Sequence, residues 1–258
     1  MSQQPRMIFT STLGSSIWSG EGWIPCPIDD SAGLATRLRQ AAGPGVRALI
    51  IASDPADFEM NDAALRDKSE SLRLSGIRTA GVSLLDDRNR EQLPVLLAES
   101  GLIFLSGGHV PTQNRFFAEI GLKEALADYQ GTVVGTSAGS MNSAELVYAQ
   151  PELPGEAVDP HYQRFLPGLG LTKISVLPHF RPDSWDTLDG LELWQDVTLP
   201  DSFRHPLCCL SDGAYLVQEG REAERVTVVG PAWLCRRGEL ELLCGPEEEY
   251  AFRLERLI

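Results

Sequence analysis

The sequence predicts an α/β protein of the three-layer α/β/α class, in which helices cover both faces of a mostly parallel, doubly wound sheet. Short β-rich runs alternate with helix-like segments through the first half of the chain, and this alternation is typical of a parallel sheet with crossover helices. The 258 residues are 43% hydrophobic and 22% charged, as in ordinary globular proteins. A chain of this length can bury one large core, so we expect a single domain over residues 1–258.

The first half of the chain supplies five strand candidates and four helix candidates. The strands are expected in the apolar runs at 7–12, 46–53, 77–85, 101–108 and 131–139. Helical periodicity is found at 31–42, 61–75, 91–100 and 112–129. Thr112, after Pro111, is the expected N-cap of the last helix. One face of that helix is expected to pack in the core through Phe116, Phe117, Ile120, Leu122 and Leu126.

The second half begins with a change in composition. Residues 150–170 are rich in Pro, Gly and acidic residues, and a loop of this length in a compact domain is usually functional. Segments 172–180, 205–220 and 225–243 then have the apolar character of strands, and we expect them to complete the sheet with C-terminal β-hairpins.

The charge and the cysteines restrict the class of protein. A formal net charge of −14 disfavours nucleic acids and anionic membrane surfaces as partners, because such binding depends on Lys and Arg. No CxxC pair occurs among the five cysteines, which are expected to be reduced residues of a cytoplasmic protein: Cys26, Cys208, Cys209, Cys235 and Cys244. The N-terminal segment has no signal-peptide pattern, and no apolar stretch is long enough to span a membrane.

A nucleophile elbow is the strongest functional motif. Residues 135–139 read GTSAG, which matches G-x-S-x-G between an apolar strand and a helix-compatible segment. A sharp strand-to-helix turn needs small neighbours, which Gly135 and Gly139 provide. This context predicts that Ser137 is a nucleophile near a helix N-terminus, with the N–H of Ala138 as one oxyanion donor. The glycines of LSGG at 105–108 end another strand, so the N–H of Gly108 is the expected second donor.

A serine nucleophile requires a base and an orienting acid. Of the four histidines, His179 follows an apolar strand run, whereas His161 lies in the long loop and His109 and His205 lie next to turns. His179 is therefore the expected base. The acid should lie between the serine and the histidine in chain order, as in other hydrolases with such an elbow. That order leaves Glu152, Glu156 and Asp159 as candidates, and spacing does not choose among them. The histidines have no metal-ligand spacing, and the chemistry needs no metal or organic cofactor.

These motifs resemble those of the dipeptidase E and cyanophycinase family of serine peptidases, whose fold is similar to that of class I glutamine amidotransferases (flavodoxin-like). The resemblance covers residues 101–235 and rests on SGGHVPTQNRFF, GTSAG, LPHF and SDGAYLVQEG. It implies Ser137 as the nucleophile, His179 as the base, and the backbone of Gly108 and Ala138 as the oxyanion hole. Within 150–170 it favours Glu152 as the acid, with Glu156 in reserve.

The family also implies a substrate class. Dipeptidase E cleaves peptides with an N-terminal aspartate, and a carboxylate-binding arginine would suit that substrate. Arg181 is the nearest candidate in sequence, with Arg164 and Arg115 as others. SGGH departs from the longer glycine run followed by Asn that is usual in the family, so His109 is expected to line the substrate pocket.

Three functions are compatible with these residues. The sequence favours a serine peptidase that hydrolyses small peptides through an acyl-enzyme. An esterase or other acyl hydrolase, or a cyanophycinase-like enzyme acting on β-aspartyl-arginine material, could use the same triad. A non-catalytic binding protein with this fold is the third reading, and the oligomeric state is left open.

Overall fold

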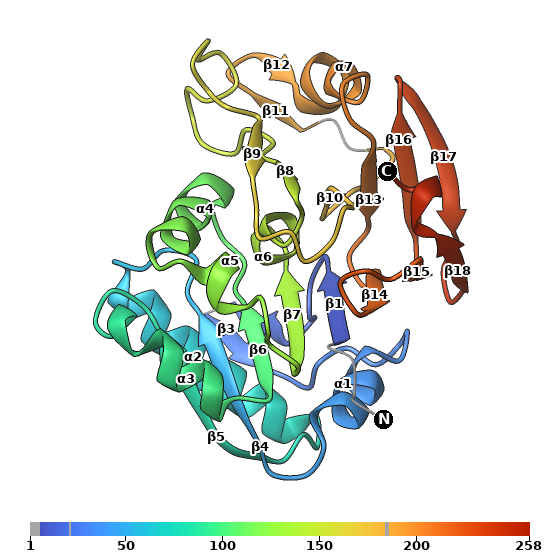
Figure 1. Cartoon of the computed structure of the whole chain (residues 1–258). Helices are drawn as coiled ribbons and strands as arrows, with labels where there is room; N and C mark the ends of the chain where they lie inside the picture. The colour runs from blue at the N-terminus through green and yellow to red at the C-terminus, as the bar shows by residue number, and fades with distance from the viewer. Residues whose placement is uncertain (1–5, 21, 184–185) are drawn as a thin grey trace.

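The structure is a computed structural model that describes residues 6–20, 22–183 and 186–258. Residues 1–5 of the N-terminal segment considered above lie outside the described residues. Figure 1 shows a central sheet with helices on both sides and a smaller sheet beside its C-terminal strands. The strands of the central sheet are β1 (Arg6–Thr10), β4 (Val46–Ile51), β5 (Thr79–Leu85), β6 (Leu102–Leu105), β7 (Thr132–Thr136), β14 (Tyr215–Glu219), β15 (Arg225–Val229) and β18 (Glu249–Arg253).

The central sheet is mixed, and its order among the described residues is β18-β15-β14-β1-β7-β6-β4-β5. The pairings from β1 through β7, β6 and β4 to β5 are parallel. On the other side of β1, the pairings to β14, β15 and β18 are antiparallel. The predicted α/β/α class and C-terminal hairpins are confirmed, and the five predicted strands of the first half are present.

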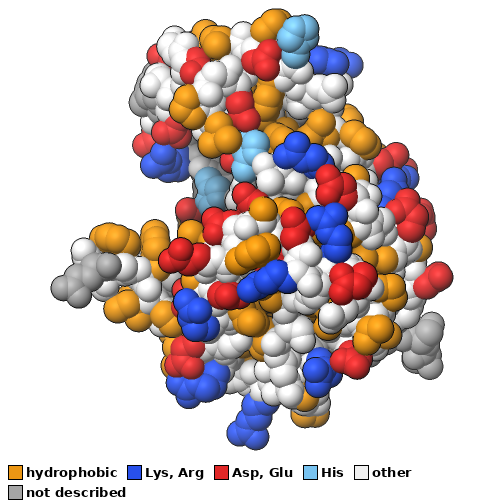
Figure 2. Space-filling model, turned by 90° about the vertical axis from the view of Figure 1, so that its left-hand side faces the viewer, with side chains coloured by type: hydrophobic (Ala, Val, Ile, Leu, Met, Phe, Trp, Pro, Cys, Tyr) orange, Lys and Arg blue, Asp and Glu red, His pale blue; other side chains and the backbone are white. Residues whose placement is uncertain are grey.

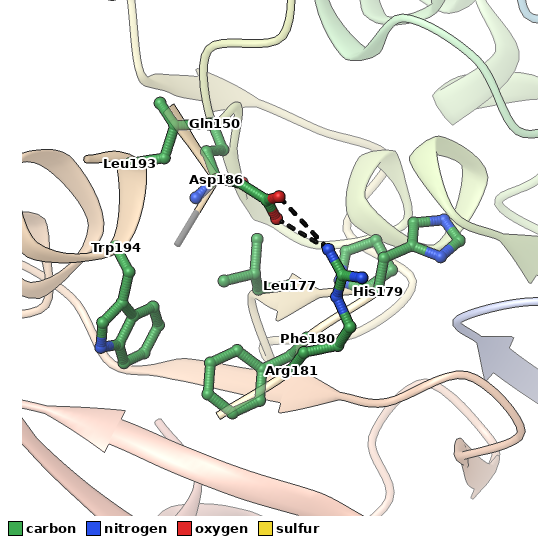
Figure 3. Close-up of a pocket in the computed structure, with 9 residues that line it drawn as sticks. Gln150, Leu177, His179, Phe180, Arg181, Asp186, Leu193 and Trp194 are labelled. Atoms are coloured by element: carbon green, nitrogen blue, oxygen red, sulfur yellow. Dashed lines mark hydrogen bonds and ion pairs between the residues drawn. The ribbon is translucent and has the colours of Figure 1, made fainter. Parts of the chain in front are cut away.

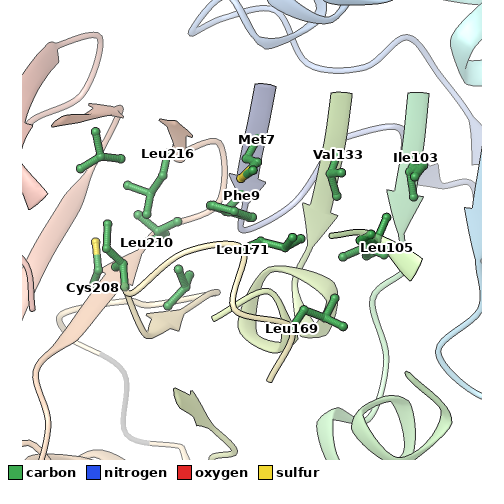
Figure 4. Packing of buried hydrophobic residues seen from close by; sticks show 14 of the residues in the cluster. Met7, Phe9, Ile103, Leu105, Val133, Leu169, Leu171, Cys208, Leu210 and Leu216 are labelled. Atoms are coloured by element: carbon green, nitrogen blue, oxygen red, sulfur yellow. The ribbon is translucent and has the colours of Figure 1, made fainter. Parts of the chain in front are cut away.

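Alternation along the strands creates the two buried faces. Met7 and Phe9 belong to one apolar cluster, whereas Ile8 between them belongs to the other. This is the period of two that places successive side chains on opposite faces of a sheet. Figure 4 shows side chains of β1, β7 and β6 on one face reaching toward the segment that carries Leu169 and Leu171.

Helices from different parts of the chain cover the two faces. On the face of Ile8 lie α1 (Leu34–Ala42) and α2 (Phe58–Leu74). On the face of Phe9 lie α3 (Leu93–Glu99), α4 (Val110–Glu119) and α5 (Leu122–Ala125). The remaining short helices are α6 (Ala138–Asn142), α7 (Leu199–Asp201), the 3-10 helices Arg90–Gln92 and Leu254–Arg256, and the π-helix Leu193–Thr198. No described helix is both long enough and apolar enough to cross a membrane.

The expected helix 112–129 differs from the structure in two respects. Gly121 adopts a left-handed conformation with φ of 63°, so the segment is divided into α4 and α5. The N-cap of α4 is His109, not Thr112. Pro111 fits within the first turn because the N–H that proline lacks would have no partner inside the helix there. The predicted packing is confirmed for Phe116, Phe117, Leu122 and Leu126, and Ile120 packs partly buried against the same cluster.

A second sheet and three hairpins were not expected from the sequence. The sheet has the order β10 (Val176–Leu177), β13 (Leu207–Leu210), β16 (Ala232–Arg236) and β17 (Glu239–Cys244). The hairpins pair β2 (Ser16–Trp18) with β3 (Trp23–Pro25), β8 (Leu146–Tyr148) with β9 (Phe165–Pro167), and β11 (Thr187–Leu188) with β12 (Leu191–Glu192). The expected long loop therefore ends at β9. Four of the cysteines are buried, and Cys26 is partly exposed.

We predict that Leu105→Ala lowers the free energy of unfolding by about 2–5 kcal/mol, because Leu105 is fully buried and its removal leaves a cavity. Leu242→Ala is the matched control, since Leu242 is 59% exposed. The control should change stability by no more than about 0.5 kcal/mol. Urea unfolding followed by circular dichroism measures both values, and equal losses would contradict the assigned core.

Candidate active site

Ser137 lies in a strained turn between β7 and α6. Its φ of 51° and ψ of −116° place a non-glycine residue in a region that side chains rarely adopt. Backbone hydrogen bonds maintain the turn: the N–H of Ser137 donates to the carbonyl of Thr10 at 3.0 Å, and Ser140 N–H donates to the carbonyl of Ser137 at 2.9 Å. Strain of this kind persists only where the surrounding structure enforces it, and it is commonly found at functional sites.

The two glycines of the elbow are required by close packing. A Cβ at Gly139 would lie 2.2 Å from the carbonyl oxygen of Leu105, and a Cβ at Gly135 would lie 2.7 Å from the backbone of Ser140. Both distances are far below van der Waals contact, so no side chain fits at either position without moving the backbone. The G-x-S-x-G pattern therefore has a steric cause in this fold.

His179 contacts Ser137 directly. Its Nε2 lies 2.9 Å from Oγ of Ser137, and its Nδ1 lies 2.7 Å from Oδ1 of Asp212. Ser11 supports this pair, because its hydroxyl donates to Asp212 at 2.7 Å and accepts from the backbone N–H of His179 at 2.7 Å. His179 is itself held at a positive φ of 56°. Serine, histidine and aspartate thus form a continuous chain of hydrogen bonds.

Strand register brings these residues together. In the parallel pair β1 and β7, Thr10 is opposite Thr136, so Ser11 and Ser137 follow at the same edge. In the parallel pair β10 and β13, Leu177 is opposite Cys209, so His179 and Asp212 leave that sheet at the same end. Residues that follow parallel strands converge on one edge, where ligands bind in open α/β sheets.

The structure places a different carboxylate beside His179 from the one predicted. Asp212, not Glu152, lies beside the far nitrogen of His179. The other two loop candidates are also engaged elsewhere. Glu156 binds Nε2 of His109 at 2.8 Å and accepts the backbone N–H groups of Glu152 and Leu153, while Asp159 accepts the N–H of His161. The prediction failed because it required the acid to precede the histidine in the chain.

Asp212 and Ser11 were missed, although each had a signal. Asp212 follows the buried run Leu207–Leu210, and Ser11 follows the buried run Met7–Thr10. A polar residue within two positions of the end of a buried strand is a candidate for the functional edge of a parallel sheet.

His109 anchors the long loop. Its Nδ1 lies 2.8 Å from the hydroxyl of Thr112, and its Nε2 lies 2.8 Å from the carboxylate of Glu156. Burial alone would raise the pKa of Glu156, but the backbone N–H donors of Leu153 and Glu152, together with His109, outweigh it and lower this pKa. Both ring nitrogens are therefore occupied by protein partners, and a substrate-binding role for His109 stays a prediction.

Two backbone segments lie next to Ser137, the start of α6 and the glycine turn after β6. Ala138 begins α6, and Gly107 packs so closely that a Cβ there would lie 3.2 Å from Cβ of Ser137. A Cβ on the adjacent Gly108, which has φ of 150°, would lie 2.1 Å from Oγ of Ser53. Among the described residues, no partner accepts a hydrogen bond from the N–H of Ala138 or Gly108.

The arginine candidates occupy three different environments. Arg181 lines a pocket beside His179 and bonds the carboxylate of Asp186 at 3.2 Å. Arg164 pairs with the buried Asp201 at 2.6 Å, and Arg115 is exposed on α4. Figure 2 shows the surface hollowed on the face turned to the viewer, with histidine and acidic side chains along the hollow.

Comparisons with known proteins identify a family and a similar fold. The sequence model of peptidase family S51 matches residues 56–226. A crystal structure of a protein from Listeria monocytogenes EGD-e, assigned provisionally to peptidase E, is similar in fold, with a TM-score of 0.58 and 14% sequence identity. The similarity covers 85% of this chain and 96% of the Listeria chain. No curated protein matches the chain in sequence.

The loop acid Glu152 gives a prediction on pH. Although the residue as a whole is exposed, desolvation of its carboxyl group, aided by the negative charge of Glu156, raises the pKa of Glu152 from 4.5 to about 7. The folded state then binds more protons than the unfolded state between these two values, so this carboxyl lowers stability progressively as pH rises through that window. Glu152→Gln removes the effect. We expect the free energy of unfolding of the wild type to fall relative to that of the variant from pH 5 to pH 7 in urea titrations. Parallel pH curves would contradict the assigned environment.

Proposed function

The chain belongs to peptidase family S51, and on this premise we propose that it hydrolyses small peptides with Ser137, His179 and Asp212 as a catalytic triad. Family membership confirms the resemblance to peptidase E-like proteins that the sequence analysis identified. The observation that carries the proposed triad is the chain of hydrogen bonds from Ser137 through His179 to Asp212, with distances of 2.9 and 2.7 Å.

The proposed reaction proceeds through an acyl-enzyme. Oγ of Ser137 attacks the peptide carbonyl while Nε2 of His179 takes its proton. Asp212 holds the imidazole with Nδ1–H directed at its carboxylate and stabilises the positive charge that develops on the ring. The same Nε2 then gives the proton to the leaving amine, and the C–N bond breaks. Water then attacks the carbonyl of the acyl-enzyme ester while Nε2 of His179 takes a proton from it. His179 returns this proton to Oγ of Ser137, which releases the acid product and restores the serine.

The oxyanion of the tetrahedral intermediate requires preorganised donors. The N–H groups of Ala138 and Gly108 suit this role because Ala138 follows Ser137, Gly107 before Gly108 packs against Ser137, and no described group accepts from either N–H. The N-terminal end of α6 adds partial positive charge at the same place. Removing one such donor typically costs about 10²–10³ in kcat.

The preference for N-terminal aspartate rests on the family resemblance and on Arg181. The guanidinium of Arg181 lies in the pocket beside His179, where it could meet a carboxylate. Asp186 already bonds this guanidinium, so a substrate carboxylate would have to share it. A panel of dipeptides with N-terminal Asp, Glu, Asn, Gln, Leu and Ala tests the preference by release of free amino acid. Equal rates across the panel would remove Arg181 as the determinant.

We predict that Asp212→Asn lowers kcat by about 10²–10⁴, because the amide no longer fixes the required tautomer of His179. Glu152→Gln is the matched control, since it makes the same chemical change in the loop, and it should retain most of the activity. Ser137→Ala should abolish hydrolysis. Steady-state kinetics on the best dipeptide of the panel measure all three variants. Full activity in Asp212→Asn together with loss in Glu152→Gln would return the role of the acid to the loop.

A further inference from the structure

We propose that the pocket next to His179 binds an apolar side chain on the leaving residue, which is the residue after the peptide bond that is cut. This inference rests on the proposed function and specifies the substrate of the same site. The pocket is lined by Gln150, Leu177, Pro178, His179, Phe180, Arg181, Asp186, Leu193 and Trp194.

The inner wall of the pocket is apolar and rigid. Leu177 and Phe180 are only 5% and 6% exposed, and the Phe180 ring packs at 4.8 Å from the ring of Trp194. Trp233 packs on Phe180 from another direction, with the ring centroids 5.2 Å apart. In Figure 3, Leu177, Phe180 and Trp194 lie around the same space, with Leu193 nearby. Rings held by other rings present a fixed surface, which favours an apolar side chain of matching shape.

The charged groups at this pocket balance each other. In Figure 3 the side chains of Arg181 and Asp186 point toward one another, and they form an ion pair at 3.2 Å. Gln150 is the only uncharged amide side chain among the lining residues, and its Nε2 donates to the hydroxyl of Thr198 at 2.6 Å. Because Asp186 and the N-terminal carboxylate proposed above already share Arg181, a charged leaving residue would enter this pocket with no group reserved for it. Such a residue would lose its hydration without gaining a dedicated partner.

The position of the pocket relative to His179 assigns it to the leaving residue. During acylation Nε2 of His179 protonates the leaving nitrogen, so that nitrogen must come within hydrogen-bond reach of the ring. The side chain of the leaving residue begins two bonds beyond that nitrogen. A pocket that His179 itself lines is therefore within reach of this side chain. The acyl part of the substrate, by contrast, stays on Ser137 after the bond breaks.

The test measures kcat/KM for a series of dipeptides with a constant N-terminal residue, taken from the panel above, and Gly, Ala, Leu, Phe, Glu or Lys as the leaving residue. The wild type should cleave the Leu and Phe peptides about 10- to 100-fold faster than the Gly, Glu and Lys peptides, because a few buried methylenes discriminate by this order. Trp194→Ala should reduce this ratio at least about fivefold, because it removes part of the apolar wall.

Two further variants make the test specific. Trp18→Ala is the matched control, because Trp18 is 60% exposed on the β2–β3 hairpin, and it should keep the wild-type preference. Asp186→Asn removes one negative charge from the opening and should raise the relative rate of the Glu peptide. If Trp194→Ala does not fold, this second variant still tests the proposal.

The outcomes distinguish a failure of the pocket assignment from a failure of the proposed function. A wild type that cleaves peptides in a Ser137-dependent manner with equal rates for all leaving residues would overturn the pocket assignment alone. An equal loss for every peptide in Trp194→Ala would also overturn it, because that loss indicates a structural effect. A wild type that cleaves no peptide would overturn the proposed function itself.

Discussion

The contact between Gly139 and the carbonyl of Leu105 is the constraint on which the site depends. Because α6 begins immediately against the end of β6, the chain must turn within a single residue after β7. That residue is Ser137, which adopts a positive φ and thereby presents its hydroxyl at the edge of the sheet. The packing of α6 against β6 therefore determines where Ser137 stands, and the surrounding structure maintains its strained conformation.

The rest of the site follows from the register of parallel strands. The edge where β1 and β7 end holds Ser11 and Ser137, and the edge where β10 and β13 end holds His179 and Asp212. The hydroxyl of Ser11 joins the two edges, since it bonds both the Asp212 carboxylate and the backbone of His179. Two sheets are thus connected at the site by one polar network, in which each group has a partner that limits its rotation.

Local patterns predicted the parts of the structure that depend on neighbouring residues. The strands, the core face around Phe116, the elbow and the choice of His179 all follow from runs of a few residues. The position of Asp212 beside His179 depends on the pairing of β10 with β13. These strands are short and far apart in the chain, and no periodicity reveals such a pairing. The second sheet was missed for the same reason. The break at Gly121 had a local signal instead, because glycine readily adopts the left-handed conformation that ends a helix.

The most direct test of the account is covalent labelling of the wild type with a fluorophosphonate, followed by peptide mapping. The proposed triad predicts one adduct, on Ser137, with labelling much slower in Asp212→Asn and unchanged in Glu152→Gln. An adduct on another residue, or labelling that is indifferent to Asp212 and lost in Glu152→Gln, would contradict it.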